Sequence, residues 1–208
     1  MYSQFWDITF PLKQGMTVWP GDTPFTRTVR NKTVNGMTWS NSELFMGAHT
    51  GTHMDAPCHA VYGADDIAAI PISVLIGPAR VVVCDQPMID EAFVKSIAPL
   101  PGERILFRTV NTDRVTEGVF HRDFVHLDEG AAALLVKNQV VLVGTDGPSV
   151  DPIETATAPC HTLFCGARIA VIENLFLRDV TAGEYDLICL PMKLEGSDGA
   201  PVRAVLAR

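Results

Sequence analysis

The sequence lacks a long apolar run, and it lacks an excess of basic residues. Its apolar stretches all fall short of the roughly 18–20 residues that a membrane-spanning helix needs. Charged residues make up only 19% of the chain, and 24 acidic residues outnumber 16 basic ones, giving a formal net charge of −8. A negative protein repels the phosphate backbone of nucleic acids. We therefore expect neither a membrane protein nor a nucleic-acid-binding protein.

The first residues also lack a basic start followed by an apolar stretch, so no signal peptide is expected. The number of cysteines is odd, and they do not form the two closely spaced pairs that bind zinc in a zinc finger. The five cysteines are Cys58, Cys84, Cys160, Cys165 and Cys189. They are expected to be mostly buried thiols in a reducing compartment, which predicts a cytoplasmic protein.

The chain has 208 residues, of which 47% are hydrophobic, and this excludes an intrinsically disordered protein. A chain of this length favours one domain, here 1–208, and buries enough surface to fold without disulfides. No internal repeat, linker or low-complexity stretch divides it.

Short β-branched runs alternate with a few helical segments, which indicates a mixed α/β fold. Strands are expected at 80–84, 104–108, 140–144, 168–173, 185–190 and 202–206. Helices are expected at 90–97 and 128–138, the second with Asp128 as its cap. Residues 1–48 are rich in turn signals and are interpreted as a structured loop.

Three histidines and one aspartate form the pattern H-x3-H-x-D-x3-H, at His49, His53, Asp55 and His59. Helical spacing would separate Asp55 from His49, whereas in an extended chain all four side chains point to one side. Two imidazoles and a carboxylate suit zinc, manganese or non-haem iron. The alternative is a polar loop in which these side chains bond only to the backbone.

Three protein ligands would leave coordination positions open, as in a catalytic site, and a bound cation makes coordinated water a strong nucleophile near neutral pH. His59 is then spare, and we expect it to act as a general base and acid. A fourth ligand or a structural hydrogen bond is its alternative role.

Further ligands are expected from the second half of the chain. His161 follows Pro159, and Glu173 ends the apolar run 169–172, where a buried carboxylate is costly unless paired. Both qualify as ligands of a second metal bridged by Asp55, although an N-terminal helix histidine and a strand-end glutamate are also ordinary features. The loop 144–151 is expected to rim the pocket.

The remaining histidines, His121 and His126, lack such a context and are expected on the surface.

The segment His49–His59 resembles the signature of the metal-dependent "cyclase" family, which includes bacterial kynurenine formamidases (arylformamidases) and isatin hydrolases. The resemblance runs nearly end to end. Further matching segments are 6–8, 18–24, 75–80, 144–147 and 201–206. It implies a mixed α/β domain whose sheet nearly closes into a barrel, in a homodimer or a larger homo-oligomer.

The resemblance also implies roles for seven residues, carried over position by position. Metal ligands are implied at His49, His53, Asp55, His161 and Glu173, with Asp55 touching both of two divalent ions, zinc or manganese. His59 matches a proton-transferring histidine, and Trp19 matches an aromatic residue that packs on an aryl substrate.

The resemblance therefore implies a hydrolase of non-peptide C–N bonds in a small aryl amide. N-formyl-L-kynurenine, an intermediate of tryptophan catabolism, is the first expected substrate. Two departures from the formamidases, Ala60 after the motif and Thr162 after His161, motivate a cyclic amide or a lactone as the second. A non-catalytic module that binds metal or a small molecule is the third hypothesis.

Overall fold

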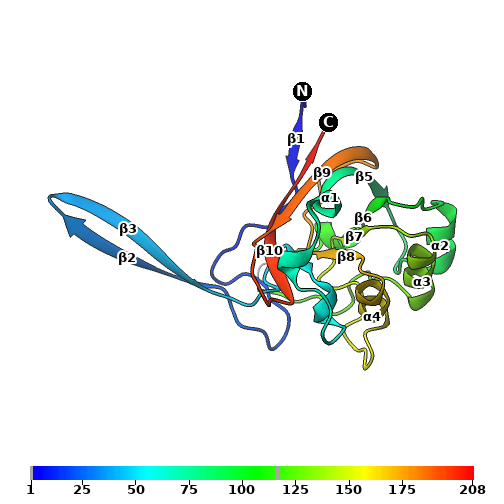
Figure 1. Cartoon of the computed structure of the whole chain (residues 1–208), viewed down its shortest axis with the longest axis horizontal. Coiled ribbons are helices and arrows are strands. Elements are labelled where there is room, and N and C mark those ends of the chain that lie inside the picture. Colours follow the sequence, from blue (N-terminus) through cyan, green and yellow to red (C-terminus); the bar gives the residue numbers. More distant parts are fainter. Residues whose placement is uncertain (1, 116–117) are drawn as a thin grey trace.

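The computed structural model describes residues 2–115 and 118–208 and shows a mixed α/β fold built around a β-barrel (Figure 1). Within these residues, one sheet has the strand order β1-β10-β4-β8-β7-β6-β5-β9. Because β9 also pairs with β10, seven of these strands close into a barrel and β1 lies outside it along β10. The strands are β1 (Phe5–Asp7), β4 (His53–Asp55), β5 (Ile76–Val83), β6 (Arg104–Arg108), β7 (Leu142–Thr145), β8 (Ala170–Glu173), β9 (Gly183–Pro191) and β10 (Gly199–Ala207). The sheet expected to nearly close is thus fully closed.

The strands β5, β6, β7 and β8 run parallel to one another. Strands β4 and β9 pair antiparallel with β8 and β5, and β10 pairs antiparallel with both β4 and β9. Of the parallel strands, β6, β7 and β8 are buried on both faces, which explains their nearly continuous apolar sequences. In β6, Leu106 points into the barrel while its neighbours Ile105 and Phe107 point outward under the helices. All six strand predictions fall on observed strands, and β6 has the predicted bounds.

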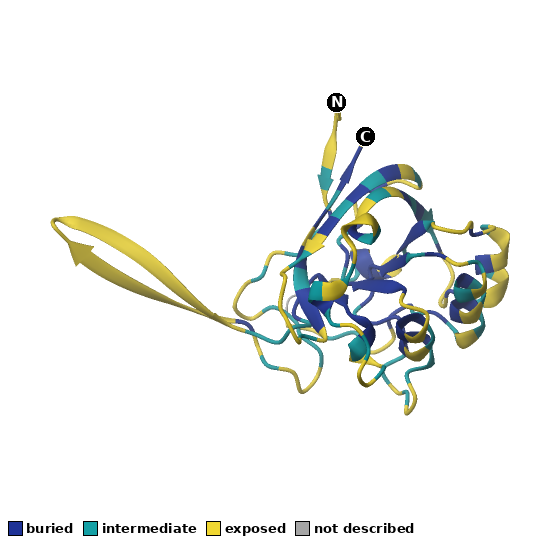
Figure 2. Ribbon diagram, viewed as in Figure 1, coloured by how far each residue is buried: buried dark blue, intermediate teal, exposed yellow. Residues whose placement is uncertain are grey.

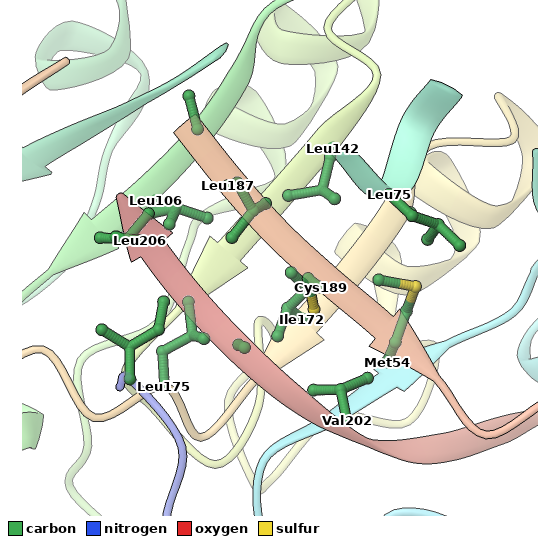
Figure 3. Close-up of a cluster of buried hydrophobic side chains, with 14 of the residues drawn as sticks. Met54, Leu75, Leu106, Leu142, Ile172, Leu175, Leu187, Cys189, Val202 and Leu206 are labelled. Carbon is green, nitrogen blue, oxygen red and sulfur yellow. The ribbon is translucent and has the colours of Figure 1, made fainter. Parts of the chain in front are cut away.

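Two hydrophobic cores lie on the two sides of this wall. The barrel interior is filled by aliphatic side chains and sulfur-containing residues, and Figure 3 shows Met54, Leu106, Ile172, Leu187 and Cys189 converging there. The outer core lies between the parallel strands and the helices. Met54, the middle residue of the short strand β4, belongs to the inner core, and all three residues of this strand are buried.

Helices α2, α3 and α4 lie together on one side of the barrel (Figure 1). The helices are α1 (Ile72–Leu75), α2 (Glu91–Ser96), α3 (Glu129–Lys137) and α4 (Pro159–Gly166), with 3-10 turns η1 (Pro57–His59), η2 (Ile67–Ala69) and η3 (Val110–Asp113). Asp90 and Asp128 cap α2 and α3 by accepting from the backbone N–H of Phe93 and Ala131. Both predicted helices are present, whereas α4 was not predicted.

The N-terminal quarter differs from the structured loop that its turn signals predicted. It contains a long hairpin, β2 (Thr26–Val34) and β3 (Met37–Phe45), which projects from the body (Figures 1 and 2). Asn35 and Gly36 form its two-residue turn with φ values of 51° and 78°. Positive φ at both central positions is what a hairpin turn of this kind requires.

In the part of the chain that the structure describes, no helix is both long and apolar enough to cross a membrane. All five cysteines are free thiols, and four of them are buried, as their apolar surroundings predicted.

Candidate functional site

The site begins at β4, which lies between β10 and β8 in the barrel wall. His53 and Asp55 are two residues apart on this strand, so their side chains emerge on the same side. The strand register places His53 directly opposite Glu173, the last residue of β8. His53 Nε2 lies 3.3 Å from Asp55 Oδ1 and 3.4 Å from Glu173 Oε2.

Two more imidazoles approach from other elements. His49, in the turn before β4, places Nδ1 2.8 Å from Asp55 Oδ1. His161, in the first turn of α4, places Nε2 3.5 Å from Asp55 Oδ2 and 3.2 Å from Glu173 Oε1. The five residues that the sequence singled out as metal ligands therefore meet at one point, although they are up to 124 positions apart (Glu173 minus His49).

Each of these three imidazoles has its outer ring nitrogen held by a separate acceptor. The acceptors are the Gly51 carbonyl for His53 (2.9 Å), Asp151 Oδ2 for His161 (2.6 Å) and Asp198 Oδ2 for His49 (3.0 Å). An outer nitrogen that donates a hydrogen bond fixes the tautomer and leaves the inner nitrogen free to bind. Histidines that ligate metals are held in the same way.

The buried charges of the cluster are strongly coupled. Burial alone would raise the pKa of Asp55, but the imidazoles of His161, His49 and His53 beside its carboxylate hold that pKa well below its usual range. Burial and the charge of Asp55 oppose ionisation of Glu173, yet hydrogen bonds from His161 and His53 lower its pKa as well.

The pKa values of the imidazoles shift in the opposite direction, upward. Burial favours neutral His53, but the hydrogen bond and charge of Asp55, followed by those of Glu173, raise its pKa to about 10. The pKa values of His49 and His161 are also raised, because their acidic partners outweigh burial. The buried carboxylates of Asp55 and Glu173 are therefore stable only with positive charge beside them, which protonated imidazoles or a metal cation can supply.

One buried atom indicates that protons on the imidazoles do not fully replace a bound cation. Among the described residues, Oδ2 of Asp55 is buried without a hydrogen-bond partner, and such an atom is costly unless something binds it. Two donor sets, each with its atoms within 4.8 Å of one another, share this residue: His49, Asp55, His59 and His53, Asp55, Glu173. Imidazole nitrogen and carboxylate oxygen are the donors that zinc and manganese accept, so the cluster fits a divalent cation.

His59 belongs to the donor set of His49 and Asp55 and lies at the solvent-exposed edge of the cluster. Its side chain is exposed in part, and Nδ1 lies 3.3 Å from Asp198 Oδ2. The expected extended path from 49 to 59 is correct only over β4, because Gly51 has a positive φ of 69° and Pro57 starts η1. His49 and His59 reach the site from a turn and a 3-10 turn, and their ring centroids are 4.3 Å apart.

A cavity of about 1110 Å³ opens above the cluster, and His49, His53, His59, His161 and Glu173 all line it. Aromatic residues form a further wall, where Trp19 packs edge-on against Phe120 and Phe124 at centroid distances of 5.3 and 6.2 Å. The loop 144–151 contributes Asp146, Pro148, Ser149 and Asp151 to the lining, as predicted.

The expectation that His121 and His126 lie on the surface is wrong. Both are half-buried, His121 lines the cavity, and His126 packs edge-on against Phe124. The aromatic cluster around Trp19 covers this region, and sequence spacing does not reveal that contact.

A family model described as "Putative cyclase" matches residues 6–152. The chain belongs to this cyclase family. A kynurenine formamidase of Bacillus mycoides (strain KBAB4) is 36% identical over 205 residues, which are 98% of this chain and 97% of that protein.

Two solved structures share the cyclase-family fold. A "predicted metal-dependent hydrolase" from Bacillus stearothermophilus superposes with a TM-score of 0.85 at 32% identity, covering 98% of each chain. Isatin hydrolase A from Labrenzia aggregata gives a TM-score of 0.85 at 21% identity, covering 98% of this chain and 93% of that one.

Sequence reasoning did not find Asp198, and it placed Asp151 only in the rim of the pocket, not as a partner of His161. Asp198, just before β10, contacts both His49 and His59, and Asp151 accepts from the ring and the backbone N–H of His161. Each is a single acidic residue in a turn-rich segment, and such residues usually cap or close turns. The sequence signal that could have found them is the turn-forming residue that follows each one, Gly199 after Asp198 and Pro152 after Asp151.

Close packing of the backbone holds His49 in place. A methyl group at Gly199 would lie 2.8 Å from Cε1 of His49 and 3.0 Å from the backbone oxygen of Met54. We expect Gly199→Ala to lower the free energy of unfolding by about 1–3 kcal/mol, because the backbone atom cannot move aside. Gly166→Ala, where nothing lies within 4 Å, should leave it unchanged or raise it. Urea denaturation measures both, and equal effects would contradict the expected packing.

Proposed function

We propose that this cyclase-family member is a metal-dependent hydrolase that converts N-formyl-L-kynurenine into kynurenine and formate. The observation that carries the proposal is the convergence of three imidazoles and two carboxylates around the unpartnered Oδ2 of Asp55, at the floor of an aromatic cavity. The match to kynurenine formamidases over 98% of the chain supports this substrate.

In this proposal His49, His53 and Asp55 hold one divalent ion, and His161 and Glu173 hold a second one that shares Asp55. Both donor sets contain Asp55, which supports Asp55 as the shared ligand. The sets group His59 with His49, and His53 with Glu173, so the division of ligands between the two ions follows the family resemblance. Zinc is the first choice for these donors and manganese the second. When bound, such a cation lowers the pKa of coordinated water and polarises a carbonyl group.

The proposed role of His59 is to move a proton. If Nδ1 donates its hydrogen to Asp198 Oδ2, 3.3 Å away, the other ring nitrogen is free to exchange a proton with the substrate. Hydrolysis breaks the bond between the formyl carbon and the aryl nitrogen, an oxygen from water joins the carbon, and the nitrogen needs a proton to leave. His59 supplies that proton and later recovers one.

Two parts of the cavity wall suit an aryl amino acid. Trp19 presents an aromatic face held by Phe120 and Phe124, on which the aryl ring can pack. Arg178 lines the same cavity, where its guanidinium lies 3.5 Å from Asp113 Oδ1 and donates to the Thr112 carbonyl at 3.2 Å, and its remaining N–H groups can donate to a carboxylate.

A cyclic amide or a lactone is the second candidate substrate. Ala60 and Thr162 both line the cavity, so the two positions that depart from the formamidase pattern face the space available to a substrate. A small residue at position 60 leaves room beside His59 for a ring.

We further propose that the chain forms a single catalytic domain, 1–208, which works in the cytoplasm as a homodimer or larger homo-oligomer in tryptophan catabolism. The free thiols suit a reducing compartment. The formamidase relatives support the pathway.

The proposed substrate is tested by comparing N-formyl-L-kynurenine, isatin and a simple lactone on the same metal-loaded enzyme. We expect the highest kcat/KM for N-formyl-L-kynurenine. A preference for isatin or the lactone would replace the first substrate with the second. Stoichiometric metal with no hydrolysis of a broad amide and ester panel would instead indicate a binding module.

Replacing His59 separates proton transfer from metal binding. We expect His59→Ala to keep its metal and to lose about 10²–10⁴-fold in kcat, the usual contribution of a general acid or base. Metal content per chain and kcat are measured on the same sample. His121→Ala, at another position of the cavity lining, is the matched control and should change kcat far less. Loss of metal with the His59 side chain would make His59 a ligand.

Replacing Asp55 tests the metal cluster itself. Asp55→Asn removes the charge shared by both donor sets, so we expect metal affinity to fall by more than the roughly 10–100-fold that the loss of an outer partner costs. Chelator competition and metal analysis measure this. Asp22→Asn, in the same cavity lining but outside the cluster, should retain the metal. Full metal occupancy in the Asp55 variant would exclude the proposed centre.

A further inference from the structure

Asn174 follows Glu173 directly and has a left-handed backbone conformation, with a φ of 54°. Few residues other than glycine adopt this conformation, and asparagine is one that does so at low cost. The backbone of Asn174 is held on both sides, because its N–H donates to the Gly147 carbonyl (2.8 Å) and its carbonyl accepts from Thr52 Oγ1 (2.5 Å). The turn at Asn174 is therefore a fixed feature of the fold.

This left-handed turn changes which side of the barrel wall the side chains reach. Along β8, Val171 belongs to the outer core and Ile172 to the core inside the barrel. Regular alternation would place the side chain of residue 174 inside the barrel and that of residue 175 outside. Instead Leu175 belongs to the inner core, so one extra residue stands on the outer side. Glu173 and Asn174 accordingly both line the cavity.

The side chain is the part of Asn174 that is free to contact a substrate. The residue is half-buried, and its backbone N–H and carbonyl are already bonded to neighbours. Within residues 2–115 and 118–208, no group forms a hydrogen bond with its side-chain amide. An amide of this kind carries two N–H donors and one acceptor oxygen. Asn174 therefore offers unused hydrogen-bonding capacity to the cavity, next to the proposed metal ligand Glu173.

N-formyl-L-kynurenine and isatin share one polar group beside the reacting amide. In both molecules a ketone is attached to the ring carbon ortho to the amide nitrogen. A ketone oxygen accepts hydrogen bonds and donates none, so it suits the N–H donors of an asparagine. Because Asn174 adjoins Glu173 in the chain, we expect its amide to meet the part of the substrate next to the scissile bond rather than the amino-acid end.

We propose that Asn174 is a specificity residue whose amide N–H donates a hydrogen bond to the ketone ortho to the scissile C–N bond. This contact rests on the proposed hydrolysis of an aryl amide, and it narrows the substrates to those with an ortho carbonyl group. A site that is built to hydrogen-bond one group of a substrate discriminates against analogues that lack the group. Simple formanilides and lactones without the ketone are then the disfavoured substrates.

The left-handed backbone alone is a competing reason for asparagine at this position. Asn174→Gly separates the two reasons, because glycine adopts a positive φ without steric cost and has no amide to donate. Gln139 provides the matched control. It also has a positive φ, 58°, and an amide side chain, but it is exposed and does not belong to the cavity lining. Gln139→Gly therefore makes the same kind of change away from the site.

The test compares ortho-formamidoacetophenone, which has the ketone, with formanilide, which lacks it, on the metal-loaded full chain. Asn174→Gly should lower kcat/KM for ortho-formamidoacetophenone and for N-formyl-L-kynurenine by about 3–10-fold, the usual effect of losing one neutral hydrogen bond. It should leave kcat/KM for formanilide unchanged. Gln139→Gly should leave all three values unchanged. An equal loss for every substrate would indicate a structural role of Asn174, and that outcome or no loss at all would overturn the proposal.

A binding measurement tests the contact without turnover. L-kynurenine retains the ketone, and titration calorimetry should show its Kd raised by about 3–10-fold in Asn174→Gly at unchanged metal content per chain. Asn174→Asp is the second variant, in case Asn174→Gly does not fold by circular dichroism. Aspartate has the same shape and tolerates the left-handed conformation, but its carboxylate accepts instead of donating, so this variant should also lose the ketone preference. A ketone preference retained in Asn174→Asp would overturn the proposed contact.

The same substrates separate this proposal from the proposed function. A wild type that hydrolyses ortho-formamidoacetophenone but not N-formyl-L-kynurenine would remove the proposed substrate and support the selectivity for an ortho ketone. Hydrolysis of N-formyl-L-kynurenine that is unchanged in Asn174→Gly would keep the proposed function and overturn the role of Asn174. No hydrolysis of any of the three amides would overturn both.

Discussion

The burial of two carboxylates side by side is the constraint on which the rest of this molecule depends. Asp55 and Glu173 lie in the barrel wall, where each ion costs several kcal/mol to desolvate unless positive charge offsets it. Three imidazoles turn their inner nitrogens toward these oxygens, yet one Asp55 oxygen has no hydrogen-bond partner among the described residues. A cation would satisfy that oxygen and release the protons that the imidazoles otherwise hold.

The barrel meets this constraint through its topology. A strand of only three residues, β4, lies between β8 and β10, and so places residues 53–55 beside residues 171–173 and 199–201. Its neighbour β8 is apolar on both faces, and its polar residue, Glu173, stands where the strand ends. Ligands collect at the carboxyl ends of strands in α/β proteins for the same reason.

The sequence predicted those parts of the site whose residues lie close together along the chain. The doubly buried strands are visible as apolar runs, and the spacing from His49 to His59 identified the donors. It did not find Asp198 or the contact between Asp151 and His161, because an acidic residue in a turn acquires its partner only through tertiary contact. It also missed the hairpin of β2 and β3, whose strands are exposed on both faces and so show no apolar alternation. The available signal was the pair Asn35-Gly36, which is typical of a two-residue hairpin turn.

The strong negative charge of the body bears on which molecules can approach the cavity. A field of this sign attracts divalent cations and repels simple anions, so a carboxylic acid of net negative charge would be a poor substrate. N-formyl-L-kynurenine carries one carboxylate and one ammonium group, so the net field does not oppose it. Within the cavity lining, the charge of Arg178 is paired with Asp113 at 3.5 Å, so it offsets the negative field locally rather than reversing it.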